Sequence, residues 1–173
     1  MGSTAAAISL PNFSSRRWGN ALGFAASFGM LGFGFYLQYV KDLQPCPLCM
    51  IQRVFFVLTG LAFLAAAIHH PVRRWGAHAY GGLIALSSLA GAAVAVRHVW
   101  IQHTPEALRP ACSPGWDFLL STFGPLESVK RILHGSGECG RVDWTFLTLS
   151  IPEWALIGFV VFAVYGVYLS FRD

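Results

Sequence analysis

Charged residues are scarce in this sequence. Aspartate, glutamate, lysine and arginine make up 12% of its 173 residues, whereas a soluble domain carries about 25%. Hydrophobic residues account for 55%, and the mean hydropathy is +0.54. The composition therefore excludes an ordinary soluble domain, and the length suits one domain that lies partly in lipid.

Other features are missing as well. The chain has no C-x-x-C-H haem-attachment motif, no low-complexity tract and no repeat of fixed period, which argues against a c-type cytochrome. The net charge of +4 does not indicate nucleic acid binding. The basic residues are scattered or lie beside apolar runs, as they do in loops that flank membrane spans.

What the sequence does contain is four long apolar runs. We expect membrane spans at about 18–39, 50–69, 76–97 and 153–171, each close to the ~20 residues that a helix needs to cross the hydrocarbon core. The prediction is an all-α integral membrane protein, a four-transmembrane-helix bundle that forms a single domain. Small residues would let neighbouring helices approach closely, and those in the first and third runs include Gly29, Gly32, Gly34, Gly81, Gly82 and Gly91.

The distribution of basic residues predicts the orientation. Four spans place both termini on one side, and that short side holds Arg16, Arg17, Arg73, Arg74 and Arg172. The positive-inside rule makes it cytoplasmic, so the loops at about 40–49 and 98–152 face outward. We interpret residues 1–17 as a cytoplasmic arm and not a cleavable or twin-arginine signal, because the following apolar run exceeds a signal core.

The four cysteines all fall in these outer loops, where disulfide chemistry is favoured. Cys46 and Cys49 form a C-x-x-C motif, the spacing of redox-active dithiols. Cys112 and Cys139 fit either a second redox pair or a structural staple worth ~3.5 kcal/mol. A zinc site is disfavoured and no metal is expected, because Cys112 and Cys139 have no C-x-x-C of their own.

Two further residues suggest what the C-x-x-C motif acts on. Arg53 lies one helical turn after Cys49, where it could stabilise a thiolate; the alternative is that it only reaches for the headgroups. A dithiol at the mouth of a helix bundle is within reach of a lipid-soluble carrier, which favours a quinone. His98 could hydrogen-bond a quinone carbonyl, or could simply be a polar residue at a helix end.

The long outer loop holds one predicted helix. Leu126, Val129, Ile132 and Leu133 form an apolar stripe at helical spacing, which predicts a short helix lying in the membrane interface. The glycines at 135 and 137 then give a flexible turn beside Cys139.

From about residue 18 to 171, the chain closely resembles the bacterial disulfide bond formation protein B (DsbB) family. The motifs are Cys46-Pro47-Leu48-Cys49 with Gln52-Arg53, His98 ahead of Cys112, Gly137-Glu138-Cys139-Gly140, Trp144, and Ile151-Pro152-Glu153-Trp154.

The resemblance implies an inner-membrane oxidase that uses ubiquinone or menaquinone to reoxidise a periplasmic DsbA-like protein. It implies the redox disulfides Cys46–Cys49 and Cys112–Cys139, with Cys112 forming the mixed disulfide with the partner and Cys49 facing the quinone. It also assigns Arg53 and His98 to the quinone site.

Two other functions remain as alternatives. A non-catalytic membrane scaffold stapled by two disulfides would leave Arg53 unexplained. A membrane dithiol reductase that passes electrons outward would need a thiol pair or cofactor facing the cytoplasm, and none of the cysteines is expected there.

Overall fold

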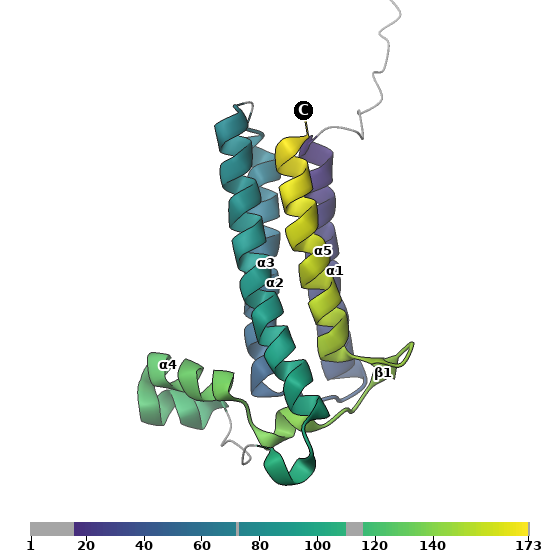
Figure 1. Ribbon diagram of the computed structural model, residues 1–173, viewed down its shortest axis with the longest axis vertical. Coiled ribbons are helices and arrows are strands. Elements are labelled where there is room, and N and C mark those ends of the chain that lie inside the picture. Colours follow the sequence, from purple (N-terminus) through teal and green to yellow (C-terminus); the bar gives the residue numbers. More distant parts are fainter. Residues whose placement is uncertain (1–15, 72, 110–115, 173) are drawn as a thin grey trace, which may run out of the picture.

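Four long helices run side by side as a bundle (Figure 1). The computed structural model describes residues 16–71, 73–109 and 116–172. The four helices are each long and apolar enough to cross a membrane, so the chain is a multi-pass membrane protein and the predicted fold class is confirmed. Their bounds are α1 Arg16–Val40, α2 Pro47–His69, α3 Arg74–His103 and α5 Ile151–Phe171.

Local sequence signals explain where the helices begin. Helix α2 starts with Pro47 at its first position, where the missing N–H is not needed, and Cys46 is its N-cap. Helix α5 starts with a capping box between Ser150 and Glu153. Helix α3 continues to His103, past the boundary expected at residue 97, so His98 lies within a helix.

The bundle core is aromatic, and some of the glycines allow close packing. The rings of Phe56 and Phe159 stack with their centroids 4.1 Å apart. A Cβ atom added at Gly91 would lie 2.5 Å from the Phe159 ring, so the expected close approach is confirmed there, as it is at Gly81 against Ser170. It is wrong for Gly29, Gly32 and Gly82, where a Cβ atom would meet nothing within 4 Å.

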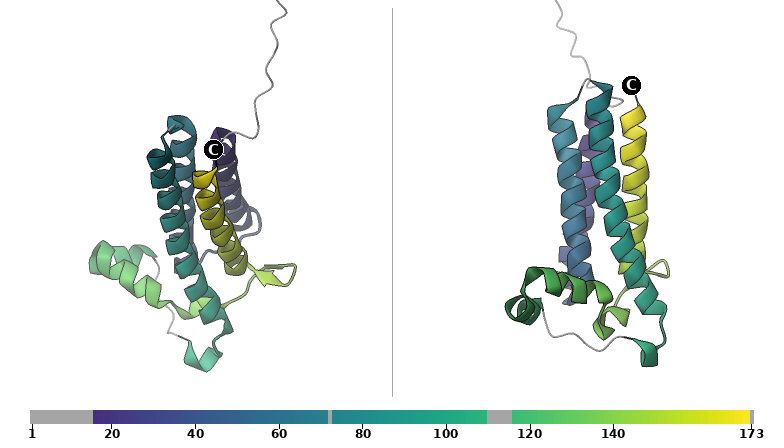
Figure 2. Two further views of the ribbon diagram at one scale, coloured as in Figure 1. Left: turned by 45° about the horizontal axis from the view of Figure 1, so that its top comes forward. Right: turned by 60° about the vertical axis from the view of Figure 1, so that its left-hand side comes forward.

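Helix α4 (Trp116–His134) projects sideways from the end of the bundle that lies opposite the C-terminus (Figures 1 and 2). It is kinked at Gly124, whose φ is 72°, ahead of Pro125. Leu126 is 85% exposed, as expected for an interfacial helix, whereas Ile132 is 2% exposed and packs with Leu48 and Ile101. One member of the predicted stripe therefore fastens the helix to the bundle. The turn of helix before Gly124 was not predicted.

A small hairpin on the same end was not predicted either. Strands β1 (Thr145–Phe146) and β2 (Leu149–Ser150) pair antiparallel just before α5. The turn residues Leu147 and Thr148 have φ values of 51° and 68°, the left-handed region that tight hairpin turns require. Two short turns, η1 (Glu106–Leu108) and η2 (Gly137–Gly140), complete the outer loop.

Candidate functional site

The C-x-x-C motif lies at the N-terminus of α2. The Sγ atoms of Cys46 and Cys49 are 3.1 Å apart, and both residues are free thiols in this structure. The backbone N–H of Cys49 donates to the Sγ of Cys46 at 3.4 Å. Cys46 is thus the N-cap of α2, and its sulfur accepts one of the helix N–H groups that would otherwise lack a partner.

Two residues distant in sequence join this pair. Turn η2 brings in Cys139, which is almost completely buried, and α3 brings in His98. The Sγ atoms of Cys46 and Cys139 and a ring nitrogen of His98 all lie within 4.8 Å of one another. The distance from the Sγ of Cys46 to the Nε2 of His98 is 3.6 Å. The start of α2, helix α3 and turn η2 therefore meet at one group of sulfur atoms.

Gln52 fixes the protonation of the His98 ring. Its Nε2 lies 3.1 Å from Nδ1 of His98, and an amide nitrogen only donates, so Nδ1 accepts. The ring proton is then on Nε2, which donates to the carbonyl of Cys139 at 3.1 Å. His98, which is 2% exposed, thus holds the Cys139 turn against the C-x-x-C motif.

The two neighbouring thiols have opposite shifts in pKa. Hydrogen bonds with Cys139 and Cys49, together with burial, raise the pKa of Cys46 well above its usual value. The hydrogen bond from Cys46 lowers the pKa of Cys139 to about 5. The shared proton therefore belongs to Cys46, and Cys139 is a thiolate at neutral pH. The thiolate is the attacking species in thiol–disulfide exchange.

Arg53 is half-buried and has partners on α1. One guanidinium nitrogen donates to Oε1 of Gln38 at 2.5 Å, and the other donates to the carbonyl of Gly34 at 3.1 Å. The guanidinium also lies 4.8 Å from the ring centroid of Phe35. These contacts offset the cost of a charge inside an apolar run. They hold the guanidinium against α1.

A large, mainly apolar cavity of about 1060 Å³ adjoins the sulfur atoms. Gly29 and Gly34 line it, so these glycines of α1 provide space for a ligand and no close helix contact. Drug-sized ligands occupy pockets of about 300–1000 Å³ that are apolar with a few polar groups. The polar and aromatic groups that line this one include Cys46, Cys49, Arg53, His98, Phe33 and Trp144.

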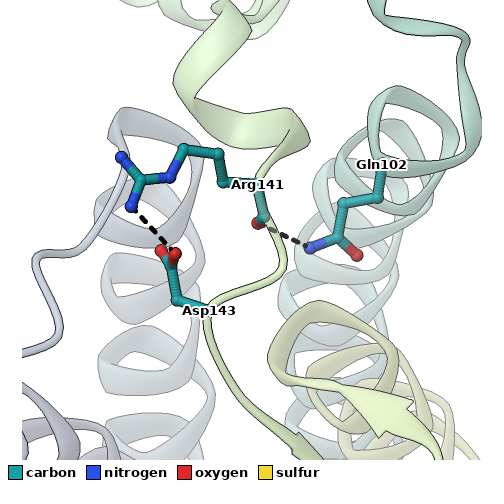
Figure 3. A network of polar contacts seen from close by, with 3 residues as sticks. All are labelled: Gln102, Arg141 and Asp143. Carbon is teal, nitrogen blue, oxygen red and sulfur yellow. Dashed lines mark hydrogen bonds and ion pairs between the residues drawn. The ribbon is translucent and has the colours of Figure 1, made fainter.

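Polar contacts hold the outer loop at the mouth of this cavity. Nε2 of Gln102 donates to the carbonyl of Arg141 at 3.4 Å, and Arg141 pairs with Asp143 at 3.1 Å (Figure 3). The Oε1 of Gln102 accepts from the hydroxyl of Ser150 at 2.8 Å. The end of α3 is thereby joined both to the segment after Cys139 and to the start of α5.

The fourth cysteine, Cys112, lies outside the described residues, so its place relative to Cys139 stays a prediction. The glycines around Cys139 also match a sequence pattern of nucleotide-binding proteins. Residues 135–140 have the G-x-G-x-x-G spacing of a dinucleotide site. They follow α4 and end in the 3-10 turn Gly137–Gly140, so they do not form the strand-to-helix turn of that motif. They therefore give no indication of a dinucleotide cofactor.

Sequence reasoning assigned no role to several residues of the site. Gln38 and Gln52 hold Arg53 and His98, and Gln102 bridges the outer loop. The available signal was that a glutamine inside a charge-free apolar run needs a hydrogen-bonding partner. That rule marks the residue but does not name its partner.

Comparisons with known proteins agree on one family. The family model for the disulfide bond formation protein DsbB matches residues 16–169. A disulfide bond formation protein B from Hahella chejuensis is 49% identical over 153 residues, which cover 88% of this chain and 92% of the relative. Relatives from Methylobacillus flagellatus (disulfide bond formation protein B) and Pseudomonas aeruginosa (disulfide bond formation protein B 1) are each 42% identical, covering 92% and 84% of this chain and 95% and 89% of their own lengths.

Proposed function

The chain belongs to the DsbB family of membrane disulfide bond formation proteins, and on that premise we propose that it reoxidises a DsbA-like thiol protein and passes the electrons to a membrane quinone. The observation that supports this proposal best is the convergence of Cys46, Cys49 and Cys139 beside a large cavity that Arg53 also lines. Family membership supports thiol–disulfide oxidoreductase activity over the alternative of an inert scaffold.

The proximity of Cys139 to Cys46 supports a relay between the two pairs. The partner's thiolate would attack Cys112 of a Cys112–Cys139 disulfide, forming a mixed disulfide and releasing Cys139 as a thiolate. Cys139 would then attack the Sγ of Cys46, breaking the Cys46–Cys49 bond and leaving the electron pair on Cys49. The second thiol of the partner would form the partner's disulfide and release Cys112, which would attack Cys139 and free Cys46. The Cys112–Cys139 disulfide would thereby be restored, and the two electrons from the partner would reside on Cys46 and Cys49.

The cavity fits a quinone as the next acceptor. Its apolar lining suits a lipid-soluble ring, and Arg53, which also lines it, could donate to a carbonyl oxygen. His98 lines the cavity as well, but it could donate to a carbonyl oxygen only by giving up its hydrogen bond to Cys139. When bound there, ubiquinone or menaquinone would supply a two-electron acceptor that leaves as quinol. On the protein side, Arg53 would keep a positive charge one turn from Cys49, which stabilises that sulfur as a thiolate.

We place this single membrane domain in the bacterial inner membrane, with both termini cytoplasmic and the cysteine loops periplasmic. The arginines at the end where α1 begins and α5 ends support this orientation. The test uses a variant in which serine replaces all four native cysteines. Leu108→Cys in this variant should react with a membrane-impermeant maleimide when the outer membrane is permeable and the inner membrane is intact. His70→Cys should react only after the inner membrane is breached. Both positions are exposed, and the reverse labelling pattern would overturn the orientation.

The function is tested by mixing a reduced DsbA-like protein, the purified chain and ubiquinone without oxygen. Quinol absorbance should rise by one equivalent for each disulfide that forms in the partner. The Cys49→Ser variant should give no quinol, because without a Cys46–Cys49 disulfide the Cys112/Cys139 pair can no longer be reoxidised. No quinol from the wild-type chain with either ubiquinone or menaquinone would refute the proposal, and partner oxidation without quinol would point to a different acceptor.

A further inference from the structure

The group formed by Cys46, His98 and Cys139 has the composition of a metal site. Two sulfur atoms and one imidazole nitrogen lie within 4.8 Å of one another. Zinc binds sulfur at about 2.3 Å and nitrogen at about 2.0–2.1 Å in tetrahedral geometry, which sets neighbouring sulfur and nitrogen ligands about 3.5 Å apart. The Cys46 Sγ to His98 Nε2 distance of 3.6 Å matches that separation.

We propose that the reduced protein binds one soft or borderline divalent cation, such as Zn²⁺, through Cys46, His98 and Cys139. Thiolate and imidazole are the ligands that this class of cation prefers. The three ligands come from the α2 N-cap, α3 and η2, so the ion would join the C-x-x-C motif to the outer loop. The Sγ of Cys49 is 3.1 Å from that of Cys46 but is not one of the three gathered ligand atoms, so the fourth coordination site is left to a solvent molecule.

Gln52 is placed to orient His98 as a metal ligand, because its side-chain amide already contacts Nδ1 of the ring. A histidine that ligates through Nε2 commonly donates its Nδ1–H to a carbonyl oxygen, which orients the ring. Turning the Gln52 amide by half a rotation would place its Oε1 where Nε2 now lies, 3.1 Å from Nδ1 of His98. The ring proton would move to Nδ1, and Nε2, which now donates to the Cys139 carbonyl, would face the cation.

Metal binding and disulfide formation then exclude each other, because both use the same sulfur atoms. Cys46 releases its proton when it ligates, Cys139 binds as the thiolate it already is, and no electrons move. Oxidation of the cysteines to disulfides removes the ligands and expels the ion. Resting on the proposed function, one consequence is that Zn²⁺ added to the reduced protein blocks its reoxidation by quinone until a chelator removes the ion.

The binding test uses the full-length chain in detergent, with neither partner nor quinone present. Protein reduced with a phosphine should take about one Zn²⁺ per chain from a chromogenic chelator, and diamide-oxidised protein should take none. The His98→Ala and Cys46→Ser variants should each weaken binding at least tenfold. Gln52→Leu should weaken Zn²⁺ binding by about 10–100-fold, the usual effect of removing the hydrogen-bonding partner of a ligating histidine.

His103→Ala is the matched control, because His103 is an exposed histidine on the same helix; it should bind Zn²⁺ as tightly as the wild type. Absence of binding by the reduced wild type, or equal binding by the reduced and oxidised forms, would overturn the site. So would wild-type affinity in His98→Ala. Quinol formation measured without metal is scored separately, so turnover without Zn²⁺ binding refutes only this inference, and binding without turnover refutes only the proposed function.

Discussion

Replacing Cys139 with serine should trap the chain in a mixed disulfide between Cys112 and a DsbA-like protein, and steady quinol formation should fall to background. In the proposed relay, Cys139 is both the thiol released from Cys112 and the nucleophile that attacks Cys46. Serine at this position can neither pair with Cys112 nor attack Cys46. In this variant the free thiolate of Cys112 would attack the disulfide of an oxidised partner, and the resulting bond lasts until the partner's second thiol resolves it. A partner with that second thiol replaced, and its remaining thiol first activated as a mixed disulfide with thionitrobenzoate, should therefore remain attached to Cys112, with thionitrobenzoate as the leaving group.

The substitution should leave the fold intact. Cys139 lies 3.5 Å from the hydroxyl of Ser136, and its backbone N–H donates to the Ser136 carbonyl at 3.0 Å, so a serine hydroxyl has a polar neighbour. The measurement is a reductant-sensitive adduct on a non-reducing gel, with the linked cysteine identified by mass spectrometry. The Cys112→Ser variant is the control and should give no adduct. An adduct on Cys46 would contradict the electron order, and no adduct at all would support a structural staple.

The helices could be predicted because their signals are local. A run of about 20 apolar residues, a proline at a first helical position and a Ser-x-x-Glu box each indicate a helix without reference to the rest of the chain. The proximity of Cys46 and Cys49 is equally local, since three positions separate them. These features needed no tertiary information, and the structure has helices at all four expected runs.

The rest of the site depends on contacts between distant segments. His98 lies 52 positions from Cys46, and nothing in the spacing of the two residues indicates that α3 and η2 bring them together with Cys139. The glycines of α1 show the same limit from another side. A small residue permits either a close helix or an open space, and at Gly29 the sequence could not distinguish them. The hairpin was missed because its turn has Leu147 and Thr148 where Gly or Asn is usual.

Arg53 shows how the structure sharpens a prediction that the sequence only outlined. The guanidinium reaches α1, where it donates to Gln38 and Gly34, and it also lines the cavity. Two roles are therefore open to it: binding a ligand in the cavity, or joining α1 to α2. The Gln38→Leu variant separates them, because it removes a contact between the helices and keeps the charge.

We expect Arg53→Leu to raise the apparent Michaelis constant for ubiquinone about thirtyfold, which corresponds to the loss of ~2 kcal/mol from a hydrogen bond to a charged donor. Arg53→Lys keeps a charge but loses the planar fork of donors, so its defect should be partial. Gln38→Leu should leave the Michaelis constant within about threefold of the wild type, because it keeps the guanidinium of Arg53. A threefold change corresponds to less than ~1 kcal/mol. Membrane insertion should survive in both leucine variants, because leucine is more favourable than arginine or glutamine within a span, and in Arg53→Lys, because one cation replaces another. The measurement is turnover against ubiquinone concentration with the partner saturating. If Arg53→Leu matches the wild type in both constant and rate, Arg53 only joins the two helices, and the donors to the quinone must be other groups of the cavity.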